Sequence, residues 1–186
     1  MSDSLITIVA IFLAVILMFV FPLMSVADRN DDIAELTVKT AVTEFVDTAK
    51  STGKITATEY SKLISKISAT GNAYDVEIEV KVLDENVGKK SAWVNGTVIG
   101  ENIYYSVYTS QILNYINDTV KDAAGNLNEG SGVYTMKEGD IISVSVKNTN
   151  QTLSQTIRGI FYTMAGSGTY EIAAQASGLV AANGTN

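Results

Sequence analysis

Cysteine and histidine are both absent from this chain of 186 residues, and proline occurs only once. Without cysteine the chain forms no disulfide and offers no thiolate as a nucleophile or metal ligand. Without histidine it has no Ser-His-Asp triad and no imidazole-bound metal. Basic residues are few, 13 against 20 acidic ones for a net charge of −7, which argues against nucleic acid because phosphate contacts need clustered Lys and Arg. A structural or binding protein remains, or an enzyme that uses carboxylates, Lys, Tyr or Ser.

Charged side chains are missing altogether from residues 4–27. A helix over this stretch is roughly 35 Å long, enough to cross a hydrocarbon core of about 30 Å. We therefore expect residues 1–27 to form a transmembrane anchor and the membrane to be one partner of the protein. The anchor residues singled out are Leu5, Ile8, Phe12, Ile16, Phe19 and Pro22.

A cleaved signal peptide is the alternative for residues 1–27. The small residues of Ser25-Val26-Ala27 suit signal peptidase, and Pro22 would break the helix just before them. However, the first residues contain no Lys or Arg, and the apolar run exceeds the usual 7–15 residues of a signal core. The balance favours an uncleaved single-pass anchor. A single arginine, Arg29, follows it, so we expect the N-terminus in the cytoplasm and the rest of the chain outside.

Residues 28–53 continue the helical period and predict an amphipathic stalk helix that Gly53 ends. The acidic stretch 28–32 lacks the glycine and the distal glutamate of a calcium loop, so a solvated helix face is expected there. One apolar face of the stalk either meets other helices in an assembly or packs on the chain's own sheet, and the sequence leaves both open. This assembly face consists of Val38, Val42, Phe45, Val46 and Ala49.

Residues 54–180 predict one small α+β domain with an antiparallel sheet and about three further helices, followed by a disordered tail at 181–186. Thr56 and Glu59 form a capping box at the start of a helix. From Tyr74 to Val82, apolar residues alternate with charged ones, as in a strand with one buried face. Further strands are expected within residues 92–108, around 142–146 and at 170–180. Helices are expected around Ile112, Leu113, Ile116 and Val120, and, with Asn150 as cap, around Leu153, Ile157, Ile160, Phe161 and Met164.

Side chains that would carry chemistry are few. Acids along the first strand alternate with apolar residues and should face solvent, and the Ser51–Lys54 match to S-x-x-K lacks its companion motifs. We expect no enzyme activity, no cofactor, no metal and no small-molecule substrate. Tyr104, Tyr105 and Tyr108 cluster, so they either pack the sheet or form a stacking platform that captures a peptide or glycan.

An apolar N-terminal helix that continues as a stalk and carries a small α+β domain resembles the pilin and pseudopilin plan. The segments 55–60, 68–79 and 134–148 are similar to TadE-like anchored proteins of Gram-positive tight-adherence and type II secretion-like clusters. Met1–Leu5 has neither the basic leader of type IV pilins nor the glutamate at the fifth mature position. The resemblance therefore implies an anchored minor component of a pilus or secretion assembly. Its partners would be other pilin-like or secretion-apparatus subunits, or further copies of this chain.

Overall fold

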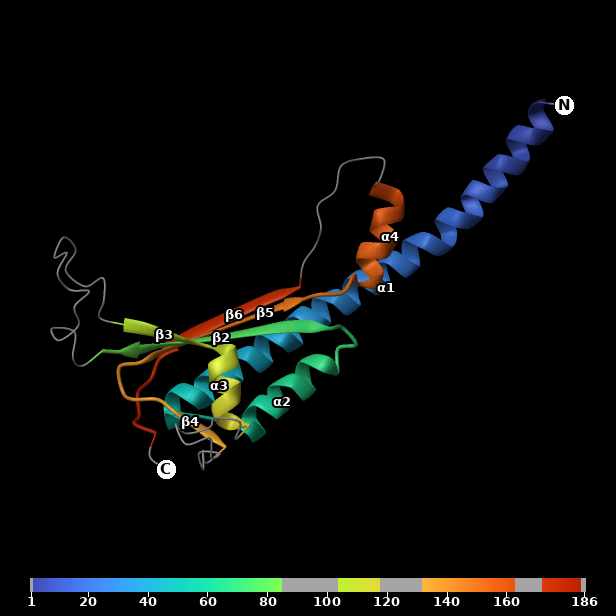
Figure 1. The fold of residues 1–186 in the computed structure, drawn as a ribbon. Coiled ribbons are helices and arrows are strands. Elements are labelled where there is room, and N and C mark those ends of the chain that lie inside the picture. The colour runs from blue at the N-terminus through green and yellow to red at the C-terminus, as the bar shows by residue number, and fades with distance from the viewer. Residues whose placement is uncertain (1, 85–103, 118–131, 163–171, 185–186) are drawn as a thin grey trace, which may run out of the picture.

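The computed structural model describes residues 2–84, 104–117, 132–162 and 172–184. One long N-terminal helix is followed by antiparallel sheets and shorter helices (Figure 1), which confirms the predicted α+β class and the general layout. The long helix projects beyond the domain at its N-terminal end and runs along the domain with its second half.

Helix α1 (Ser2–Thr52) runs without interruption from the apolar segment into the domain. Pro22 lies inside it, so the break that a cleavage site would favour is not seen; proline is tolerated where neighbouring backbone groups adjust. The helix ends as predicted at Gly53, whose φ of 67° is a left-handed conformation that glycine adopts without a Cβ penalty.

The main sheet has the strand order β3-β2-β5-β6, with every neighbouring pair antiparallel. Its strands are β2 (Tyr74–Leu83), β3 (Tyr104–Tyr108), β5 (Ile141–Asn148) and β6 (Ala173–Leu179). Side chains alternate between the faces, so Val76, Ile78 and Val80 are buried while Asp75 and Glu77 are exposed, as predicted.

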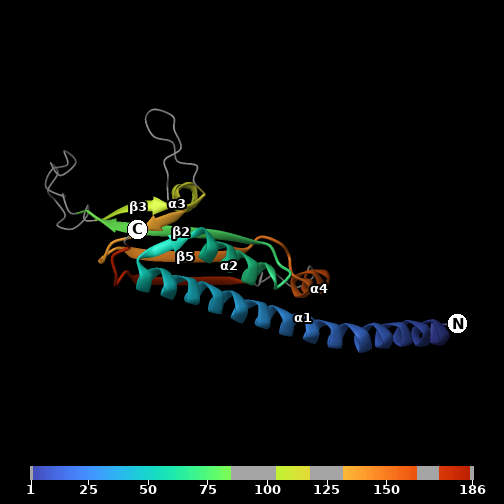
Figure 2. The ribbon, with the colours of Figure 1, turned by 90° about the horizontal axis from the view of Figure 1, so that it is seen from below.

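Two helices cover the inner face of this sheet (Figure 2). They are the second half of α1 and α2 (Ala57–Ser68), which begins with the predicted Thr56–Glu59 capping box. Leu63 and Ile67 of α2 are buried in the same core as the inner faces of β2 and β5. One hydrophobic core therefore joins the stalk half of α1 to the sheet.

Short elements complete the domain. Helix α3 (Thr109–Ile116) follows β3 and buries Ile112 and Ile116, as expected from their spacing. Strands β1 (Lys54–Thr56) and β4 (Val133–Thr135) pair in a small second sheet that was not predicted. Each has only three residues, too few for an alternating pattern to be recognised.

Helix α4 (Leu153–Tyr162) confirms the predicted fourth helix, but its cap is not Asn150. The Thr152 hydroxyl accepts from the Gln155 amide, and the Gln155 side chain accepts from the Thr152 amide. Asn150 instead accepts from the Ala73 amide. Leu153, expected on the buried face, is 55% exposed because the first turn of α4 buries Ser154 instead.

The C-terminal segment is bonded to the domain, so the expectation of a tail disordered from residue 181 is wrong for residues 181–184. The Ala181 amide donates to the Lys50 carbonyl at 2.9 Å, and the Gly184 amide donates to the Met136 carbonyl at 2.9 Å. The Glu138 amide donates to the Asn183 side chain at 2.8 Å. Partners distant in sequence supply these bonds, so local composition did not reveal them.

Several predictions lie outside the described residues. They are the strand material at 92–103, Val120 of the third helix, most of the expected loop at 122–132, Met164 of the fourth helix and the first residues of the last strand.

Candidate functional site

The N-terminal half of α1 is apolar and exposed. It contains an 18-residue window with a mean hydropathy of 3.0, none of it buried within the protein, so it is long and apolar enough to cross a membrane. The exposed fractions of the predicted anchor residues are 66% for Leu5, 65% for Ile8, 70% for Phe12, 40% for Ile16 and 70% for Phe19, and Pro22 is also exposed. Leaving one such side chain in water rather than burying it costs about 1.5–3 kcal/mol. This half of α1 therefore needs an apolar environment that the described residues of the chain do not provide.

The predicted assembly face lies elsewhere, in the core of the domain. Its five residues are at most 5% exposed: Val38, Val42, Phe45, Val46 and Ala49. They pack with Ile78, Val144 and the other inner-face residues of the sheet. In the structure this face packs on the chain's own sheet, which is one of the two alternatives that the sequence left open. These residues are not free to contact another subunit.

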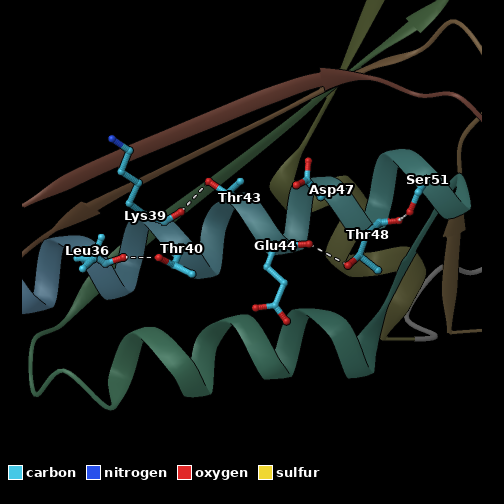
Figure 3. A pocket seen from close by; sticks show the side chains of 8 residues that line it. All are labelled: Leu36, Lys39, Thr40, Thr43, Glu44, Asp47, Thr48 and Ser51. Atoms are coloured by element: carbon cyan, nitrogen blue, oxygen red, sulfur yellow. Dashed lines mark hydrogen bonds between the residues drawn. The ribbon is translucent and has the colours of Figure 1, made fainter.

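The opposite face of the same stretch of α1 is open to solvent (Figure 3). The side chains on this open face all come from the one helix: Leu36, Lys39, Thr40, Thr43, Glu44, Asp47, Thr48 and Ser51. The hydroxyls of Thr40, Thr43 and Thr48 donate to carbonyls of their own helix at 2.8 Å. Leu36 is 66% exposed. On this outer face the apolar Leu36 side chain therefore lies beside polar ones, and the hydroxyl protons of the three threonines already form hydrogen bonds within the helix.

The boundary between the two halves of α1 is held by α4. The Thr152 hydroxyl donates to the Asp31 carboxylate at 2.7 Å, and Asp31 is only 6% exposed. Asp28 accepts from the Ser154 hydroxyl and, at 2.9 Å, from the guanidinium of Arg158. The acidic stretch is thus only partly a solvated face, because Asp28 and Asp31 dock α4 onto α1.

These bonds also change the acidity of Asp28. The hydrogen bond from Ser154, followed by that from Arg158, holds the pKa of this carboxyl below its ordinary value, since both donors favour the charged form. Asp28 is consequently ionised at neutral pH.

The three clustered tyrosines divide between the two faces of the sheet. Tyr108 pairs with Glu79 and Tyr104 with Leu83, while Tyr105 pairs with Val82. Because directly paired residues share a face, Tyr104 and Tyr108 lie on the outer face and Tyr105 on the inner one. All three are exposed, at 40%, 49% and 59% for Tyr104, Tyr105 and Tyr108. A single platform of three rings is therefore excluded, and two rings remain on the outer face.

A polar hollow of about 580 Å³ lies beside Tyr108 on the outer face. Most of the side chains that line it carry a hydroxyl, amide or carboxylate group, although much of the surface is their carbon: Glu77, Ile78, Glu79, Tyr108, Thr109, Ser110, Ser143, Ser145 and Gln175. Glu79 accepts from the Ser106 hydroxyl at 2.7 Å. Such a surface can form hydrogen bonds with a polar ligand next to an aromatic ring.

Sequence reasoning missed the contacts of α4 with α1 because the partners are 121 to 130 residues apart. Two local signals could have pointed to them. Thr152 and Gln155 have the spacing of a capping box, and Asp28 and Asp31 have the spacing of one helix face.

Comparison with known proteins adds no relative: no family model matches this chain, and neither a curated protein nor a solved structure does.

Proposed function

We propose that this protein is a single-pass, membrane-anchored structural component of a pilus or secretion assembly, with its domain outside the cytoplasm. The observation that carries the proposal is the continuity of α1, whose exposed apolar half becomes, without a break, the central helix of the domain core. A continuous helix of this kind fixes the position of the domain relative to the membrane, which suits a structural role. The resemblance to pilin-like anchored proteins supports the same role.

An uncleaved anchor is favoured by the surroundings of Ala27. This residue, the last of the signal-peptidase pattern, lies within α1 and is 1% exposed. The next residue, Asp28, binds Ser154 and Arg158. In the folded protein the bond between Ala27 and Asp28 is therefore helical and covered.

Two surfaces of α1 are available for contacts with other subunits. One is the apolar half, where helices of neighbouring subunits can pack within the membrane through their van der Waals surfaces. The other is the outer face around Leu36, next to Ile33, which is 55% exposed. The buried face of Val42 and its neighbours has no part in this proposal.

N-terminal sequencing of the protein from a carbonate-washed membrane fraction tests the anchor. We expect a chain that begins at or next to Met1 and remains in the pellet. A mature chain that begins at Asp28, or its release by carbonate, would overturn the proposal.

Disulfide crosslinking tests the assembly, and the absence of native cysteine makes each introduced cysteine unique. We expect Ile16→Cys or Leu36→Cys to give crosslinked oligomers in native membranes. Thr58→Cys is the matched control, since Thr58 is exposed on α2 and belongs to neither surface of α1. Crosslinking that is equally weak at all three positions, in a protein that stays monomeric at high concentration, would contradict an assembly role.

The polar hollow beside Tyr108 favours a second function, capture of a peptide or glycan. Here Tyr108→Ala should abolish binding on a glycan array or peptide library without unfolding the domain. Tyr105→Ala is the control, because Tyr105 lies on the same strand but on the opposite face. Equal binding by both variants and the unmodified protein would exclude Tyr108 from any such site.

A further inference from the structure

Helix α4 points from the domain toward the apolar half of α1. Its cap residue Thr152 binds Asp31, two residues further on Ser154 binds Asp28, and one turn after that Arg158 binds Asp28 as well. The chain direction of α4 is therefore opposite to that of α1, so that the C-terminal end of α4 lies toward the N-terminal half of α1. Figure 1 shows α4 leaving α1 on the side of the N-terminal projection.

The length of α4 brings its last turn to the level of the apolar run. From Ser154 to Tyr162 a helix rises about 12 Å at 1.5 Å per residue. Asp28, which both Ser154 and Arg158 contact, is the first charged residue after the uncharged stretch 4–27. Because α4 continues from there toward the side of the N-terminal projection (Figure 1), its last turn lies near the depth at which α1 enters a bilayer.

The composition of α4 suits the surface of a membrane. Within Leu153–Tyr162 there is one charged residue, Arg158, in a chain with a net charge of −7. Leu153 is 55% exposed although Ser154 beside it is 3% exposed, because the polar side chains of the first turn face α1. Apolar and aromatic residues in a short helix favour the boundary of headgroups and acyl chains, and the one basic group of α4 is paired with Asp28.

We propose that α4 is an interfacial helix, whose last turn lies in the headgroup region of the same bilayer that α1 spans. This inference rests on the proposed anchoring. Lipid is the favoured occupant because α4 adjoins the exposed apolar band of α1, where Leu23 is 50% and Val26 57% exposed. Bonded to Asp28 and Asp31 at one end and immersed at the other, α4 holds the domain at a fixed height and angle above the membrane.

Single cysteines labelled with an environment-sensitive dye test this in the full-length protein, reconstituted in phosphatidylcholine vesicles with and without lipids that carry a quenching group. Gly159→Cys is the probe, because Gly159 is exposed and a Cβ there meets no heavy atom within 4 Å. Phe19→Cys reports on the anchor, and Tyr108→Cys, on the outer face of the sheet, is the distant control. Thr156→Cys, exposed on the same helix, is the second probe in case Gly159→Cys does not fold.

We expect the dye at position 159 to shift its emission to shorter wavelength and to be quenched by headgroup-level quenchers. The dye at position 19 should respond to deep quenchers and the dye at position 108 to neither. Quenching at 19 without quenching at 159 or 156 overturns the interfacial helix and leaves the anchor intact. Absence of quenching at 19 overturns the anchor itself. A dye at 159 that is shielded only at high protein-to-lipid ratio, and not quenched by lipid, would instead assign the surface to a second copy and overturn the proposal.

Discussion

Val42 distinguishes a core role of the stalk helix from an assembly role. Its side chain is fully buried among the inner-face residues of the sheet. Val42→Ala removes two methyl groups, worth about 1.6 kcal/mol at 0.8 kcal/mol each. The cavity left behind raises the loss to about 2–3 kcal/mol, because close-packed surroundings relax only partly.

Leu36→Ala provides the matched control on the same helix. It removes more carbon than Val42→Ala, but Leu36 is 66% exposed, so its free energy of unfolding should change by less than about 0.5 kcal/mol.

Urea unfolding of the full-length protein in a mild detergent, followed by far-UV circular dichroism, measures both variants. With a slope of about 1–3 kcal/mol per M, Val42→Ala should lower the midpoint by roughly 0.7–3 M, whereas Leu36→Ala should shift it by less than about 0.5 M. If Val42→Ala kept its midpoint and lost only oligomer formation, the face would belong to a subunit interface and our reasoning on the core would be refuted.

Three further predictions concern α4, the end of α1 and pH. Thr152→Val removes both the cap of α4 and a donor to a buried carboxylate, so we expect a loss of about 2–4 kcal/mol in the free energy of local opening. Hydrogen exchange of α4 measures this loss, and Thr156→Val, which loses only a bond to its own helix, should exchange like the unmodified protein. Gly53→Ala places a Cβ 2.3 Å from the Ala182 carbonyl oxygen, at a φ of 67°. Backbone strain alone costs about 1–3 kcal/mol, and the clash adds to it, so the loss in the free energy of unfolding, measured by urea, should exceed that range. An unchanged urea midpoint would contradict the packing of the C-terminal segment. The pKa of Asp28 in the folded protein lies below its ordinary value near 3.8, so its stabilisation of α4 is present above that pH and is lost as pH falls through the folded pKa. The protection of the α4 amides, measured relative to their intrinsic exchange rates, should therefore fall in acid, and Asp28→Asn should abolish that pH dependence.

Local patterns in the sequence predicted the longer helices and strands of this protein, but not the three-residue strands β1 and β4. The uncharged run predicts the N-terminal half of α1, the alternation from Tyr74 predicts β2, and the Thr56–Glu59 box predicts the start of α2. Each of these patterns depends only on residues close in sequence, so it can be recognised without knowledge of the fold. Gly53 is only partly such a case: its φ of 67° at the end of a helix is a local demand for glycine, but the Ala182 carbonyl, 2.3 Å from where a Cβ would lie, is a tertiary one.

The tertiary structure alone decided how those elements are used. An apolar stripe of a helix has the same sequence pattern whether it packs on its own sheet or on another subunit, and only the fold places Val42 in the core and Leu36 on the surface. Likewise, strand register separates Tyr105 from Tyr108, and chain topology brings Thr152 to Asp31 across 121 residues. Burial and long-range hydrogen bonds are properties of the folded chain, so no pattern within one segment could have specified them.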